Sequence, residues 1–199
     1  MTAPGPRSTP DRDRLIALLA TRSARQGDFV LASGRRSTLY VDCRITTMSP
    51  EGQLLIGREG LRTLRATGWA IDAVGGLTLG ADPVSYAIAH ASARAHEEGD
   101  SGGMLRAFTV RKEAKAHGTG RLIEGPFAPG DRVVVIEDVI TTGGSALRAA
   151  ESLRAAGGQV LGVLALVDRE EGGREALAEA GIEVIAIVGA KELLERLRG

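Results

Sequence analysis

Two adjacent acidic residues, Glu137 and Asp138, close a strongly apolar stretch, and a run of small polar residues follows them. The whole segment reads VVVIEDVITTGGS and covers residues 133–145. Acidic side chains are poor occupants of the end of a buried strand unless a partner offsets their burial. Two neighbouring carboxylates can accept two neighbouring hydrogen bonds, and a vicinal diol donates such a pair. The chemistry expected at this point is therefore recognition of a sugar.

The loop after the two carboxylates has the composition of an anion-binding turn. A helix is expected to begin at Ser145, so that unpaired N–H groups and the positive end of the helix dipole face the loop. Gly143 and Gly144 allow the backbone to approach a ligand closely, and the hydroxyls of Thr141 and Thr142 add donors. A phosphate beside a diol describes a ribose 5-phosphate. The alternative is a polar turn before a capped helix, for which TTGGS alone is equally typical.

The surrounding segments must position this loop, and their apolar patterns alternate between strands and helices. Strands are predicted at 70–76, 104–110, 121–125, 132–138, 159–169 and 182–188. Helices are predicted at 11–25, 50–67, 83–98, 145–158, 174–180 and 191–197, the first capped by Asp11. Two shorter strands are expected within 29–42, around a Ser-Gly-Arg-Arg turn. The alternation predicts an α/β fold with a mainly parallel sheet, whose ligands bind beyond the carboxyl ends of the strands.

The chain of 199 residues suits one domain with a full core. Residues 1–10 are rich in Pro, Ser and Thr and are expected to form a mobile tail. Residues 11–199 are expected to form the single domain, in which 11–45 depart from the alternation and make a small N-terminal lobe.

Charge and cysteine content exclude some classes of partner. Twenty-five basic and 25 acidic residues cancel, so we expect neither nucleic acid nor a membrane surface as a partner. We expect no secretory signal and no membrane-spanning helix, because the chain lacks an apolar stretch at its start and any apolar run of about 20 residues. Cys43 is the one cysteine, which favours a reducing compartment. The expected location is cytoplasmic.

The segment VVVIEDVITTGGS resembles the signature of the type I phosphoribosyltransferase family. The resemblance implies that family's fold, a mainly parallel sheet flanked by helices with a small N-terminal hood. It also implies binding of phosphoribosyl pyrophosphate (PRPP), with the ribose diol on the acidic pair and the 5-phosphate on the loop. The implied PRPP-binding residues here are Glu137, Asp138, Val139, Ile140, Thr141, Thr142, Gly143, Gly144 and Ser145.

The charged segment RKEAKAHGTG, residues 111–120, holds two of the chain's three lysines. Compact ammonium groups suit a leaving pyrophosphate, and the glycines would let a lid move. The segment resembles the mobile catalytic loop of the orotate phosphoribosyltransferases, and the alternative is a solvated charged turn. The resemblance implies further PRPP contacts from Arg111, Lys112, Lys115 and His117. It makes Lys115, His117 and Asp138 the catalytic residues.

Two more segments resemble the orotate phosphoribosyltransferases, whose likeness runs from about residue 25 to 190. FVLASGRRSTLYVD, residues 29–42, is similar to their base-binding segment, with a surface hairpin as the alternative. GVLALVDREEGG, residues 162–173, resembles the strand end that supplies an arginine for orotate. Arg169 is that arginine, and Thr141 would also contact orotate. Because two glutamates follow Arg169, an ion-paired or helix-capping arginine is the alternative.

The resemblance implies transfer of a phosphoribosyl group from PRPP to orotate, which yields orotidine 5′-monophosphate and pyrophosphate in UMP biosynthesis. It implies Mg²⁺ held by substrates and water, with no metal-ligating residues of the protein, and a homodimer. This chain has Ala32 and Leu79 where many family members carry lysine, which leaves those contacts to other groups. The alternatives are transfer to another base and a ligand-sensing regulator built on the same fold.

Overall fold

The computed structural model describes residues 8–30, 36–113 and 122–198. Its centre is a six-stranded sheet in the order β5-β4-β3-β6-β7-β8. All neighbouring strands are parallel except β5, which runs antiparallel to β4. The strands are β3 (Ala73–Leu77), β4 (Arg106–Val110), β5 (Ile123–Glu124), β6 (Arg132–Ile140), β7 (Gln159–Asp168) and β8 (Val184–Gly189).

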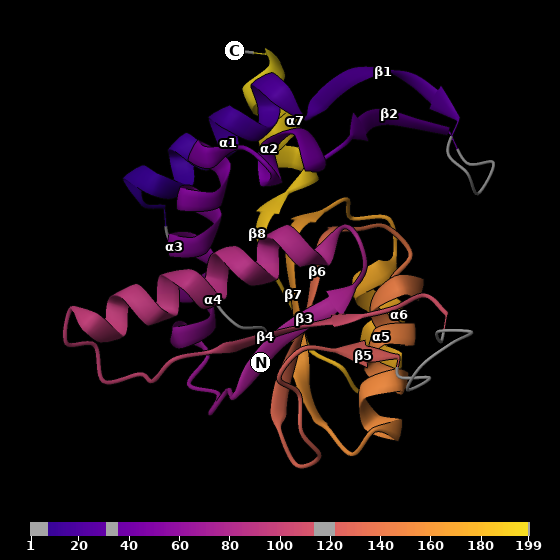
Figure 1. Cartoon of the computed structure of the whole chain (residues 1–199). Helices are drawn as coiled ribbons and strands as arrows, with labels where there is room; N and C mark the ends of the chain where they lie inside the picture. Colours follow the sequence, from indigo (N-terminus) through magenta and orange to yellow (C-terminus); the bar gives the residue numbers. More distant parts are fainter. Residues whose placement is uncertain (1–7, 31–35, 114–121, 199) are drawn as a thin grey trace.

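Helices cover both faces of this sheet, and an antiparallel hairpin extends away from it beside α7 (Figure 1). The hairpin consists of β1 (Ala24–Val30) and β2 (Arg36–Val41). The helices are α1 (Pro10–Arg22), α2 (Arg44–Thr47), α3 (Pro50–Ala66), α4 (Ala81–Glu97), α5 (Gly144–Ala155), α6 (Gly173–Glu179) and α7 (Ala190–Arg198).

The core has two layers because side chains on β6 alternate between the two faces of the sheet. Val134 and Ile136 join the layer under α1, α3, α4 and α7. Val133 and Val135 join the layer under α5 and α6. A strand that is apolar on both faces is typical of the centre of a parallel sheet, and the sequence predicted this position for β6.

The order of the strands reverses beside β3. From β3 the chain moves to β4 on one side and later returns to place β6 on the other side. The carboxyl ends of β3 and β6 therefore open at the same edge, which is the topological switch point where α/β sheets bind ligands. The segments that leave this edge are residues 78–80 and 141–143.

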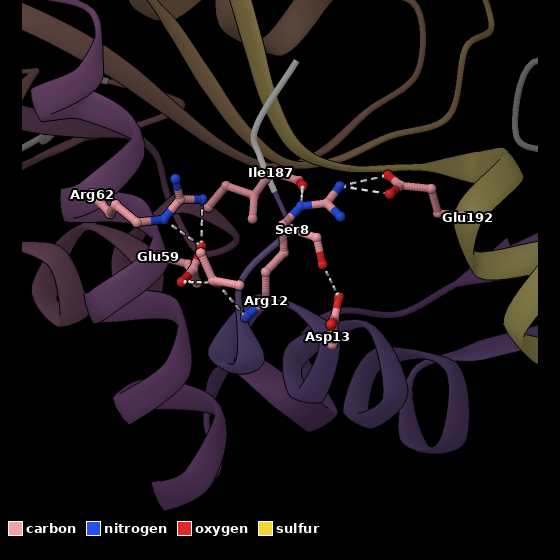
Figure 2. Close-up of polar contacts among 8 residues, drawn as sticks. Ser8, Arg12, Asp13, Glu59, Arg62, Ile187 and Glu192 are labelled. Atoms are coloured by element: carbon pink, nitrogen blue, oxygen red, sulfur yellow. Dashed lines mark hydrogen bonds and ion pairs between the residues drawn. The ribbon is translucent and has the colours of Figure 1, made fainter. Parts of the chain in front are cut away.

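A buried arginine ties the N-terminal helix to the rest of the domain (Figure 2). Arg12 is 7% exposed, and its Nε donates to the carbonyl of Ile187 over 3.0 Å. Its Nη2 donates to both carboxylate oxygens of Glu192, at 2.6 and 2.8 Å. Buried Glu59 accepts a second set of bonds, from the Thr9 hydroxyl and from Arg62. These contacts join α1 to α3, β8 and α7.

The structure confirms the predicted α/β class and its mainly parallel sheet, and it corrects the start of the chain. Thr9 caps α1, with its hydroxyl accepting from the Arg12 N–H, so the prediction that Asp11 is the cap was wrong. The helix ends at Arg22 and not at residue 25, because Ala24 already pairs with Val41 in the hairpin.

The short helix α2 was not predicted.

The division into a tail (1–10) and a domain (11–199) stays a prediction, because residues 1–7 lie outside the described residues. Pro10, the last residue of the predicted tail, belongs to α1. No helix in the described part of the chain is long and apolar enough to cross a membrane.

Replacing Arg12 with Ala should lower the free energy of unfolding by about 2–4 kcal/mol, because the Ile187 carbonyl and the Glu192 carboxylate would lose the hydrogen bonds that Arg12 donates to them. The measurement is urea unfolding followed by circular dichroism. Arg14→Ala is the matched control, since Arg14 lies in the same helix, is 57% exposed and makes only ion pairs of 3.6 Å. Equal losses in the two variants would contradict the anchoring role of Arg12.

Candidate active site

A cavity of about 920 Å³ opens at the switch point. Its lining comes from the end of the hairpin, the segments after β3 and β6, the end of β4 and the segment after β7. The predicted site residues on its wall are Arg111, Lys112, Glu137, Asp138, Val139, Thr141, Ser145 and Arg169. Predicted site residues from Arg111 to Arg169 thus line the same cavity. The sequence indicated that these separate segments share one site only through the family resemblance.

The two carboxyl groups at the end of β6 are both held in a weakly solvated place. Burial, then the neighbouring Asp138, raises the pKa of Glu137 to about 8, while Arg148 acts in the opposite direction. Burial also raises the pKa of Asp138, although the Val139 N–H donates to its Oδ1 over 2.9 Å and lowers it. A ligand that donates hydrogen bonds or carries positive charge would stabilise the ionised form of such buried acids.

Close packing fixes Asp138 against the segment after β3. A Cβ atom at Gly80 would collide with the Asp138 carboxylate, so this position accepts no larger residue without displacing the acid. The neighbouring Leu79 is 64% exposed and lines the cavity. This part of the wall therefore supplies backbone and an apolar side chain in place of a positive charge.

The loop after β6 presents the start of α5 to the cavity. Gly143 has φ 80°, a left-handed conformation that favours glycine, and α5 begins at Gly144. Because glycine carries no side-chain oxygen, it cannot cap the first turn, whose N–H groups can then serve an external anion. Thr141 and Ser145 line the cavity, and Thr142 is exposed.

Four described residues of the predicted PRPP set, Ile140, Thr142, Gly143 and Gly144, do not line the cavity. Ile140 is 1% exposed and belongs to the core layer under α5, so its side chain cannot contact a ligand in the cavity. Its carbonyl accepts from the Arg169 N–H and is also occupied. Lys115 and His117, the predicted lid residues, lie outside the described residues, and Ala32 does as well.

The start of the predicted lid lies on the cavity wall. Arg111 and Lys112 follow β4 directly, and both line the cavity. Arg111 forms a long ion pair with Glu124 of β5, with 3.5 Å between Nη1 and Oε1. The cationic end of the site therefore begins directly after β4, beside the acidic Glu124 of β5.

Arg169 is buried and already holds an anion. Its Nη2 lies 2.8 Å from Oε1 of Glu171, 2.6 Å from the Ser37 hydroxyl and 2.7 Å from the Leu39 carbonyl. Its Nε is buried and has no hydrogen-bond partner among the described residues. The ion pair with Glu171 matches the alternative interpretation of Arg169, yet the residue also lines the cavity.

Sequence reasoning missed the cavity residues at the end of the hairpin. Arg44 at the start of α2 pairs with Asp42 through two bonds of 2.8 Å, and both line the cavity. Hydrogen bonding from Arg44 lowers the pKa of Asp42, which remains charged beside the two buried acids. The acidic and basic residues directly after the apolar LYV stretch were a signal that could have revealed this pair.

Thr78 and Thr109 form a second missed group on the cavity wall. Their hydroxyls donate to opposite oxygens of Asp82, over 2.6 and 2.8 Å, so this acid braces the segment after β3 against β4. In the described part of the chain, no group of three or more His, Cys, Asp or Glu side chains could hold a metal ion.

The sheet order and the acidic strand end beside an uncapped helix define the class of type I phosphoribosyltransferases. No protein-family model matches the chain. It is 46% identical over 187 residues to the orotate phosphoribosyltransferase of Aquifex aeolicus, covering 92% of this chain and 98% of that protein. The chain belongs to the orotate phosphoribosyltransferase family, which confirms the predicted resemblance.

Solved structures agree with this assignment. The orotate phosphoribosyltransferase of Mycobacterium tuberculosis H37Rv in complex with Fe(III) dicitrate has a TM-score of 0.77 and 44% identity, over 92% of this chain and 99% of that one. The same enzyme in complex with PRPP has a TM-score of 0.74 and 39% identity, with the same two coverages.

Replacing Glu137 with Gln should stabilise the ligand-free protein at alkaline pH. Because the pKa of Glu137 is raised from 4.5 to about 8 in the folded state, ionisation costs the wild type stability as pH rises through this window. At about 1.4 kcal/mol per pKa unit, the gain amounts to several kcal/mol above pH 8 and vanishes below pH 4.5.

The measurement is the difference in melting temperature between variant and wild type at pH 5 and pH 8.5. Glu151→Gln is the control, since Glu151 is exposed on α5 and should show the same difference at both values. If the difference in melting temperature between Glu137→Gln and wild type does not grow with pH, burial does not raise the pKa of Glu137.

Proposed function

We propose that this protein transfers the phosphoribosyl group of PRPP to N1 of orotate, giving orotidine 5′-monophosphate and pyrophosphate in UMP biosynthesis. The observation that carries the proposal is the shared cavity of the acidic pair, the uncapped start of α5 and Arg169. One wall suits a ribose phosphate and another carries a guanidinium for an acidic base. The family membership of the chain supports the same reaction.

PRPP would bind along the end of β6. Glu137 and Asp138 would accept hydrogen bonds from the ribose 2- and 3-hydroxyls, which relieves two buried acids. The 5-phosphate would sit on the loop of residues 141–145, where the first turn of α5 supplies N–H donors and the dipole favours an anion. The pyrophosphate would extend towards Arg111 and Lys112 at the end of β4, and the predicted contacts from Lys115 and His117 would complete this end.

Orotate would occupy the side of the cavity formed by the hairpin and Arg169. The guanidinium has a planar set of donors that suits a carboxylate or an imide edge. The Thr141 hydroxyl lies on the same cavity wall and would help to orient the ring. These contacts favour an acidic pyrimidine over a neutral base.

The chemical step would break the bond between C1 of the ribose and an oxygen of pyrophosphate while N1 of orotate forms the new bond and gives up its proton to the leaving pyrophosphate or to solvent. Positive charge develops on the ribose and negative charge on the leaving group. Asp138, next to the sugar, would favour the first, and the cations after β4 would favour the second. A reaction of this kind depends on placing charges around the substrates more than on a strong base.

Mg²⁺ is the cofactor we propose, bound through the substrate. Oxygens of pyrophosphate, ribose and water would hold the ion, as the family resemblance implies, and Glu137 and Asp138 on the cavity wall would stay with the ribose hydroxyls. The ion would neutralise charge on the leaving group, while Glu137 and Asp138 orient the ribose that carries it.

We also propose a cytoplasmic homodimer. The groove of about 490 Å³ between α3 and α4 is lined by apolar side chains, among them Leu54, which is 48% exposed, and by charged ones, among them Arg58 and Glu98. A surface that carries both kinds of group can meet a second copy in a symmetric contact. Cys43 is a free and buried thiol, which fits a reducing compartment.

The reaction is tested by the loss of orotate absorbance on mixing protein, PRPP and Mg²⁺. We expect orotate to be consumed only when both PRPP and Mg²⁺ are present, because the charge on the leaving group must be neutralised. Comparable consumption of uracil, adenine or hypoxanthine would favour transfer to another base. Binding of PRPP without turnover of any base would favour the ligand-sensing regulator.

The homodimer is tested by mixing two inactive variants, Lys115→Ala and Asp138→Asn. If the lid of one subunit completes the site of the other, a mixed dimer has one intact site and one site with both defects. Random re-pairing makes half of the dimers mixed, so activity should recover to about a quarter of wild type. No recovery would place each lid on its own site, and a monomer in sedimentation would contradict the dimer itself.

A further inference from the structure

The guanidinium of Arg169 is the most crowded donor at the cavity. Its side chain is 6% exposed, and three oxygens lie within 2.8 Å of Nη2. They belong to Ser37, Leu39 and Glu171. Nη2 carries two hydrogens, and these are donated to the Ser37 hydroxyl and the Leu39 carbonyl. The contact with Glu171 is an ion pair, and it is the one that another anion could replace.

Of these three oxygens, that of Glu171 belongs to a charged side chain that pairs with Nη2 as an ion, while the other two accept its hydrogen bonds. The Leu39 carbonyl belongs to the backbone of β2 and cannot move without the hairpin. The Ser37 hydroxyl is itself held, donating to the Leu39 carbonyl over 3.0 Å and reaching Glu171 Oε1 at 3.4 Å. Glu171 lies between β7 and α6, and its side chain is 15% exposed.

Charge also singles out Glu171. A buried guanidinium requires an anion, and removing that anion leaves an uncompensated charge. The described structure supplies Glu171 for this purpose, while the unpaired Nε of Arg169 shows that the donors of the guanidinium are not all used. A second anion that approaches Arg169 from the cavity would meet both an attractive guanidinium and a repulsive carboxylate.

We infer that Glu171 is a resident counter-ion that competes with the acidic group of the base for Arg169. The inference rests on the proposed function and adds a specificity-determining residue to it. In the empty site Glu171 neutralises Arg169, so phosphate groups are drawn to the cations after β4 and not to the base side. When the base binds, its acidic group displaces Glu171 or shares the guanidinium with it. Glu171 thus weakens binding of the base while keeping other anions out.

Glu171→Gln tests this inference because the amide keeps the size and shape of the side chain while the charge is lost. At saturating PRPP, we expect the KM for orotate to fall about fivefold or more, because a repulsive charge close to the acidic group is removed. The kcat and the KM for PRPP should stay within about twofold of wild type.

A second readout does not need turnover. The free variant should melt below wild type, since Arg169 loses its counter-ion, and orotate should raise its melting temperature by more than it raises that of wild type. Glu170→Gln is the matched control: Glu170 is the neighbouring residue, its side chain is 42% exposed, and it lies 3.8 Å from Lys191. The control should change neither readout.

An unchanged or higher KM for orotate in Glu171→Gln would overturn the inference and make Glu171 a support that orients Arg169. Equal thermal shifts by orotate in variant and wild type would overturn it as well. A wild type that consumes no orotate would instead overturn the proposed function, so the two failures are distinguishable.

Discussion

The burial of two adjacent carboxyl groups at the end of β6 is the constraint around which the site is organised. β6 lies at the centre of the sheet and is apolar on both faces until it reaches Glu137. At that point burial raises the pKa of both acids. A protein that keeps such groups at the end of a central strand loses stability in the empty state, and a ligand that satisfies them recovers it.

Other features of the switch point follow from this constraint. Gly80 leaves space for the Asp138 carboxylate, and Asp82 braces the segment that contains Gly80 through two threonine hydroxyls. On the other side of the acids, the left-handed Gly143 turns the chain directly into α5. The same edge therefore holds a buried negative pair next to a helix start that favours anions. Opposite preferences a few residues apart select a ligand with hydroxyls and a phosphate on one small frame.

Much of the fold and part of the site could be predicted from the sequence, because both have local causes. Apolar runs and helix patterns predicted the order of elements, and the segment EDVITTGGS, residues 137–145, indicated its chemistry through residue types alone. The strand order could not be predicted, since periodicity does not say that β6 returns beside β3. The partners of Arg169 were equally hidden: Ser37 precedes it by 132 residues. Asp42 and Arg44 were visible as a charged pair but acquire meaning only when α2 is placed against Asp138.

Two buried arginines, Arg12 and Arg169, attach the N-terminal segment to the sheet. Arg12 fastens α1 to β8 and α7, away from the cavity, through bonds to Ile187 and Glu192. Arg169 fastens β2 to the end of β7 at the cavity itself, through bonds to Ser37 and Leu39. The hydrogen bonds of Arg12 lie away from the cavity and contribute to stability. Arg169 also lines the cavity, so an anion that binds to Arg169 would act on the attachment of the hairpin as well. Under the proposed function, binding of the base at Arg169 would therefore also act on the placement of the hairpin.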